Sequence, residues 1–156
     1  MSKPTLHSIA KRMGKELDAI EWKTPSHVYN PLQYAWSAYE TYLERYGSAA
    51  GRALLLGMNP GPWGMAQTGV PFGNISAVRD WFGIETRLAR HLPEQHPKYP
   101  ILGMACHRDE GSGQRVWGWA RERYATPERF FRHFFIWNYC PLLFLAKDHN
   151  MIPSAL

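Results

Sequence analysis

The segment that most constrains this chain is GMNPGPWGMAQTGVPFG at residues 57–73, which contains five glycines and three prolines. Glycine lets a backbone approach a ligand closely, and proline stiffens the path of the chain. The apolar run ALLL at residues 53–56 precedes the segment and predicts a buried strand over residues 53–58. We therefore expect a rigid, apolar pocket at the carboxyl end of a strand, where open α/β sheets bind ligands. Large apolar side chains within the segment support this: Met58, Trp63, Met65 and Phe72.

The composition is that of a folded domain with a basic surface. The chain has 156 residues, of which 45% are hydrophobic and 14% aromatic, so one domain with a real core is expected rather than disorder. The net charge of +5 favours a polyanionic partner modestly, and most arginines are expected on a solvated surface. Cys106 and Cys140 are too few for a disulfide framework, a metal cage or an iron–sulfur cluster. We expect two reduced cysteines in or near the core, no cofactor and no metal.

No targeting or membrane segment is apparent in the sequence. The first residues carry lysines and an arginine without a continuous apolar region, so no signal peptide is expected. No apolar run approaches the ~20 residues that a membrane-spanning helix needs. The expected location is the cytoplasm, with the nucleoid, for a bacterial protein and the nucleus for a eukaryotic one.

Helical periodicity recurs along the chain. Residues 5–20 repeat apolar side chains at helical spacing and predict an amphipathic helix. A second helix is expected from Pro31 to about Arg45, and we interpret its aromatic face as core packing. A short helix up to Ile84 and another over residues 113–124 follow. Thr126 is expected to cap a further turn, with a proline at its first position.

One more strand and two loops complete the expected organisation. The strand-forming run FFIW predicts a strand over about residues 133–138 that ends at Asn138. An asparagine there is usually a turn former, but apolar neighbours favour burial, and a buried amide must be satisfied, which favours a ligand-reading role. We interpret residues 85–110 as a long loop and residues 147–156 as an unfinished loop. Three histidines have no metal-ligand spacing and are expected in loops or at the surface: His91, His96 and His107.

Several common site motifs are absent. Neither G-x-G-x-x-G nor a Walker-type Lys-Ser/Thr follows the first strand, which argues against dinucleotide and P-loop nucleotide binding. No G-x-S-x-G nucleophile elbow occurs, which argues against an α/β-hydrolase. The chemistry must therefore be sought in the 57–73 segment itself.

That segment, with its continuation AVRDWFGI, resembles the first motif of the single-strand-selective monofunctional uracil-DNA glycosylases, a branch of the uracil-DNA glycosylase superfamily. The resemblance is long and nearly gapless and runs from about residue 28 to 146. Further matching segments are VYNPLQYAW at 28–36, HPKYPILGMAC at 96–106, RVWGW at 115–119 and FIWNYCPLLFLA at 135–146.

The resemblance implies a fold, a partner and a set of site residues. The fold would be a three-layer α/β domain over residues 1–156, with a central parallel sheet flanked by helices. The chain would act as a monomer on uracil-containing DNA, away from membranes. Asn59 would position the water that attacks the sugar C1′ in an oxocarbenium-like transition state, because an amide cannot be a strong base. Phe72 would stack on the flipped base and Asn138 would read its edge. Three further residues would contribute to substrate binding: Met58, Gly61 and Met65.

The sequence departs from the family pattern in one respect. The family carries a downstream His-Pro-Ser segment whose histidine stabilises the departing uracil, whereas the only His-Pro here is His96-Pro97, in a different matching region. This indicates an amino-terminal portion of the domain, truncated at its C-terminal end, with half of an active site. The leading hypothesis is a base-excision-repair glycosylase that hydrolyses the N-glycosidic bond of uracil, or of C5-modified uracil, in single- or double-stranded DNA. The alternatives are a non-catalytic module that binds single-stranded nucleic acid by stacking and charge, and a destabilised remnant without function.

Overall fold

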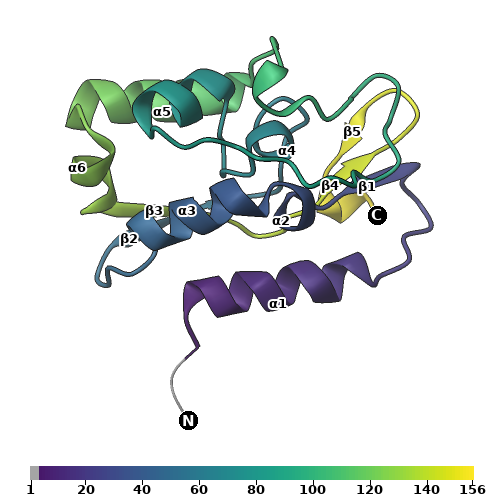
Figure 1. The fold of residues 1–156 in the computed structure, drawn as a ribbon, viewed down its shortest axis with the longest axis horizontal. Coiled ribbons are helices and arrows are strands. Elements are labelled where there is room, and N and C mark those ends of the chain that lie inside the picture. Colours follow the sequence, from purple (N-terminus) through teal and green to yellow (C-terminus); the bar gives the residue numbers. More distant parts are fainter. Residues whose placement is uncertain (1–3) are drawn as a thin grey trace.

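The computed structural model describes residues 4–156 and arranges its strands in two sheets (Figure 1). A parallel pair joins β2, Ala53–Gly57, to β3, Phe134–Asn138, with Gly57 opposite Asn138. An antiparallel sheet has the order β1–β4–β5, with bounds His27–Tyr29, Leu143–Leu145 and Asn150–Met151. The predicted α/β class and the parallel pairing of the two predicted strands are confirmed.

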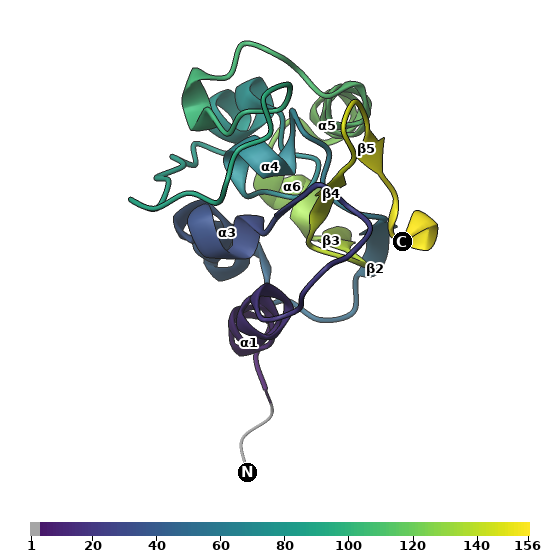
Figure 2. The same ribbon diagram turned by 90° about the vertical axis from the view of Figure 1, so that its right-hand side faces the viewer.

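Helices surround the parallel pair. Figures 1 and 2 show α1 and α5 on opposite sides of the layer that contains β2, β3 and α3. No helix within residues 4–156 is both long enough and apolar enough to cross a lipid bilayer. The α-helices are α1 Leu6–Asp18, α2 Pro31–Tyr34, α3 Trp36–Tyr46, α4 Met65–Thr68, α5 Gly111–Tyr124 and α6 Pro127–Phe131. Shorter helical turns are a π-helical turn, Ala77–Trp81, and two 3₁₀ turns, Gly103–Ala105 and Pro153–Ala155.

The helix predictions are confirmed, with one break. In α1, the Thr5 hydroxyl accepts from the Ser8 backbone N–H at 3.1 Å, and the Ser8 hydroxyl accepts from the Thr5 N–H at 3.0 Å, which is a capping box. The helix predicted from Pro31 is interrupted at Ala35, whose φ and ψ of −118° and 27° lie outside the helical region. In α6, Thr126 caps the first turn as predicted, because its side chain accepts from the Arg129 N–H.

The aromatic face of α3 packs in the core, as the sequence indicated. The rings of Tyr42 and Phe135 stack with centroids 5.5 Å apart, and those of Tyr46 and Phe131 stack at 4.0 Å. The Tyr42 hydroxyl donates to the Ile136 carbonyl at 2.8 Å, and burial raises the pKa of that phenol well above its usual value. Because a buried hydroxyl without a partner is costly, this bond ties α3 to the middle of β3. The aromatic core therefore fixes the strand that ends at Asn138.

The strand predicted over residues 53–58 forms as β2, but the prediction that it is buried is wrong. Leu54, Leu56 and Met58 expose 58%, 57% and 53% of their surfaces, whereas Gly57 is buried. Side chains alternate along a strand, so these three share one open face. Within the described residues β2 pairs only with β3, so no second neighbour covers its other edge. An apolar strand is buried only when strands flank both of its edges and other layers cover both of its faces. Within the described residues, β2 has one neighbouring strand and one open face.

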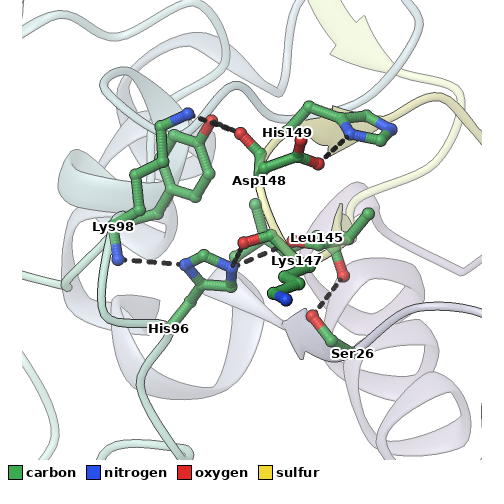
Figure 3. A network of polar contacts seen from close by, with 9 residues as sticks. Ser26, His96, Lys98, Leu145, Lys147, Asp148 and His149 are labelled. Carbon is green, nitrogen blue, oxygen red and sulfur yellow. Dashed lines mark hydrogen bonds and ion pairs between the residues drawn. The ribbon is translucent and has the colours of Figure 1, made fainter.

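The loop predictions at the C-terminal side also need correction. His96, expected in a loop or at the surface, lies outside the helices and strands but is only 2% exposed. Its Nε2 donates to the Ala146 and Lys147 carbonyls at 2.9 and 3.1 Å, while its Nδ1 accepts from the Lys98 N–H at 3.1 Å (Figure 3). These bonds anchor the turn that links β4 to β5. Residues 147–156, expected as an unfinished loop, therefore form β5 and a 3₁₀ turn.

Replacing both Leu54 and Leu56 with serine should reduce self-association and leave stability nearly unchanged. An apolar face beside an open strand edge promotes association, whereas exposed substitutions usually change stability by less than ~0.5 kcal/mol each. Analytical ultracentrifugation and thermal unfolding measure the two effects. The matched control is Leu143→Ala in fully buried β4, which should lower the free energy of unfolding by ~2–5 kcal/mol. An equal loss of stability in both variants would contradict the exposure of β2.

Candidate functional site

The residues expected to bind the base converge where β2 and β3 end. Five of them line one hollow of about 160 Å³. The carboxyl ends of two parallel strands meet at the same edge of a sheet, which explains how segments far apart in sequence share this hollow. Met65 is the exception, because it lies behind Asn138 rather than in the lining. The expected residues in the lining are Met58, Asn59, Gly61, Phe72 and Asn138, and the others are Pro60, Glu110, Ser112 and Asn150.

The amide of Asn59 is oriented by backbone carbonyls. Its Nδ2 lies 3.2 Å from the Leu142 oxygen and 3.5 Å from those of Met151 and Pro60. Carbonyl oxygens accept and do not donate, so the NH2 group must face them and the Oδ1 atom must face away. The side chain therefore offers the hollow an acceptor. Such an acceptor can orient a water molecule but cannot remove its proton.

Asn138 ends β3 with a nearly buried amide. The residue is 4% exposed, and its Nδ2 donates to the Met65 Sδ at 3.1 Å. A side chain at Gly57 would clash with the Asn138 Oδ1 and would come within 2.7 Å of the Phe72 Cε2. Glycine at position 57 therefore makes room for both the amide and the aromatic ring. The sequence places Asn138 at the strand end but gives no sign of the sulfur partner.

The backbone of Phe72 has an unusual conformation that sets the direction of its ring. Its φ is 55°, in the left-handed region that bulky residues rarely adopt. The Phe72 carbonyl accepts from the Trp117 indole N–H and from the Asn74 backbone N–H, both at 2.9 Å. A side chain at Gly113 would clash with the same carbonyl, so α5 approaches it closely. Helix α5, for which the sequence predicted a helix but no role at the hollow, thus holds the backbone of Phe72.

Glu110 is a pocket residue that the sequence analysis missed. It precedes α5 directly, and its Oε1 accepts from the Ser112 hydroxyl. Its Oε2 is buried without a hydrogen-bond partner and packs against Gly61 and Gly64, where any side chain would clash with the carboxyl group. Burial raises the pKa of this carboxyl above its usual value. Nothing in the sequence places this glutamate against the glycines of another segment.

Stability should depend on pH through Glu110. Because burial raises its folded-state pKa, the folded protein binds the proton more tightly than the unfolded chain. The resulting stabilisation is complete below the unfolded pKa of ~4.3 and is lost as the pH rises through the raised folded value. As the pH rises from acidic to neutral, the melting temperature of Glu110→Gln should therefore rise relative to that of wild type. The control is Glu122→Gln, at an exposed position of α5, and parallel pH profiles for all three proteins would contradict this assignment.

Alanine at Gly57 should destabilise the folded protein by about 1–3 kcal/mol, as overpacking of a filled site does. The added methyl group would press on the Asn138 amide and on the Phe72 ring. Gly118→Ala, within α5 and with open space around its Cα, is the matched control and should stabilise the helix by roughly 0.5–1 kcal/mol. Chemical denaturation of both variants measures the difference. Equal effects of the two alanines would contradict the close packing around Gly57.

Comparison with known proteins identifies relatives of the chain. No protein-family model matches the sequence. Over 147 residues, or 93% of the chain, it is 48% identical to the single-strand selective monofunctional uracil-DNA glycosylase of Rattus norvegicus, and 52% and 47% identical to the proteins of that name from Bos taurus and Mus musculus. The chain spans about half the length of these relatives, between 52% and 54%.

Among solved structures, that of wild-type Pedobacter heparinus SMUG2 superposes with a TM-score of 0.62 over 99% of this chain and 63% of that one. At 19% sequence identity this likeness concerns the fold alone. The sequence relatives are much closer, with about half of the aligned residues identical. Along 93% of its length the chain is therefore similar to the single-strand selective monofunctional uracil-DNA glycosylases, of whose curated members it spans about half the length.

Proposed function

We propose that the hollow at the ends of β2 and β3 receives a uracil flipped out of DNA, and that the chain takes part in hydrolysis of its N-glycosidic bond. The observation that carries the proposal is the convergence on one hollow of Asn59 and Phe72, from the 57–73 segment, with Asn138, from the end of β3. The relatives are named as single-strand selective, so single-stranded DNA is the first substrate to test. The same proposal extends to two further substrates, double-stranded DNA and uracil modified at C5.

The polar edge of uracil matches the Asn138 amide. Uracil presents an acceptor at O4 and a donor at N3–H, which pair with an amide NH2 and an amide oxygen respectively. Cytosine presents the reverse pattern and would leave both amide groups unpaired. In a nearly buried site such a polar mismatch discriminates strongly. Phe72 would provide the apolar face on which the base ring stacks.

Asn59 fits a mechanism in which the bond breaks before water adds. The C1′–N1 bond breaks with its electron pair leaving on uracil, and the sugar becomes an oxocarbenium ion. Water then bonds to C1′ and releases a proton to solvent. The Asn59 Oδ1 can orient that water, because its Nδ2 is engaged by the Leu142, Met151 and Pro60 carbonyls. Strong proton removal is not required once the sugar carries positive charge.

Stabilisation of the departing uracil anion is the second requirement. The family assigns it to the histidine of a His-Pro-Ser segment, which residues 1–156 do not contain. Removing one preorganised electrostatic donor typically slows an enzyme by ~10²–10³-fold. We therefore expect residues 1–156 tested on their own to recognise the base but to release it slowly.

Release of free uracil from a single-stranded, uracil-containing oligonucleotide tests the proposal. Asn59→Ala and Asn138→Ala should each reduce release by roughly 10²–10³-fold, the usual effect of removing a group that acts on the transition state. The control is Gln33→Ala, which removes an exposed amide from α2 and should leave the rate unchanged. Equal rates in all four proteins would contradict the site. Salt-dependent DNA binding by wild type without any base release would instead indicate a non-catalytic binding module.

A further inference from the structure

The orientation of the Asn138 amide decides which base the hollow accepts. The amide oxygen and NH2 group are nearly equal in size, so packing alone distinguishes the two orientations poorly. Turned by 180°, the same side chain would present its oxygen where the NH2 stands and would then match cytosine instead of uracil. Selectivity for uracil therefore requires a neighbouring group that interacts favourably with the amide NH2 group and unfavourably with the amide oxygen.

The neighbour that meets this requirement is Met65. Its Sδ lies 3.1 Å from the Asn138 Nδ2, and the two residues are only 1% and 4% exposed. A thioether sulfur accepts hydrogen bonds weakly and cannot donate one. The observed orientation gives the sulfur a donor, whereas the reversed one would set the amide oxygen against the sulfur lone pairs. In a buried contact no water can compensate for that repulsion.

The sulfur is held in place by its own surroundings. Met65 is the first residue of α4, and its carbonyl accepts from the Gly69 N–H at 2.8 Å. Gly69 has a φ of 80° and closes the helix, which fixes the short turn that carries Met65. On the other side of the amide, Gly57 leaves room for the Asn138 Oδ1. The amide thus lies between a hydrogen-bond acceptor and a glycine.

We propose that Met65 is a positioning residue for base selectivity, whose Sδ holds Asn138 in the orientation that matches uracil and mismatches cytosine. The inference rests on the proposed function, in which Asn138 reads the base. It gives Met65 a role beyond filling space in the core cluster to which its side chain also belongs. A space-filling methionine could be replaced by leucine without any change in selectivity.

Met65→Leu separates the two roles, because leucine has a similar volume and lacks an acceptor. Free uracil and free cytosine are titrated into wild type and variant, and the side-chain NH2 signals of Asn138 are followed by nitrogen-15 NMR. We expect the ratio of uracil to cytosine affinity to fall roughly tenfold in the variant, equivalent to about 1.4 kcal/mol, and the Asn138 signals to shift. The control is Met104→Leu, a partly buried methionine packed against the same cluster, which should keep the wild-type ratio.

The outcomes are distinguishable. If wild type prefers uracil and folded Met65→Leu keeps the full preference, the inference is overturned and the proposed function stands. If wild type binds neither base, the proposed function fails and the inference fails with it. Should Met65→Leu not fold, norleucine at the methionine positions retains the shape without the sulfur, and the same loss of preference is expected.

Discussion

The parallel pairing of β2 with β3 is the contact on which the site depends. The last pair of its register joins Gly57 to Asn138. The two segments stay hydrogen-bonded beyond this pair, because the Tyr139 and Cys140 N–H groups donate to the Gly57 and Met58 carbonyls at 2.8 and 2.9 Å. Two segments about eighty positions apart in sequence therefore leave the sheet side by side. Without this pairing the Asn59 and Asn138 amides would not line a common hollow.

The groups that shape the hollow stand mostly outside it. The Trp117 indole holds the strained backbone of Phe72, and the Met65 sulfur fixes the Asn138 amide. The Leu142 carbonyl orients the Asn59 amide from the segment between β3 and β4. Each contact fixes the orientation of a side chain before any ligand binds, so the hollow is preorganised. Burial of the Glu110 carboxyl disfavours its charged form and raises its pKa, so this group should lower stability at neutral pH.

Local patterns predicted the helices, both central strands and the position of Asn138, because periodicity and capping act over a few residues. The roles of Asn59 and Phe72 came from the family resemblance and not from composition. Long-range contacts could not be anticipated: the exposure of Leu54 depends on strands beside it, and the burial of His96 depends on a turn fifty residues away. The same holds for the positive φ of Phe72, since nothing in a phenylalanine indicates it.

The most direct test of the account is a crystal structure of this chain with uracil bound. We expect the ring in the hollow at the ends of β2 and β3, stacked on Phe72, with its N3–H and O4 facing the Asn138 amide. The Asn138 Nδ2 should remain in contact with the Met65 sulfur. A uracil bound elsewhere, or seated in the hollow with its N3–O4 edge turned away from Asn138, would contradict it.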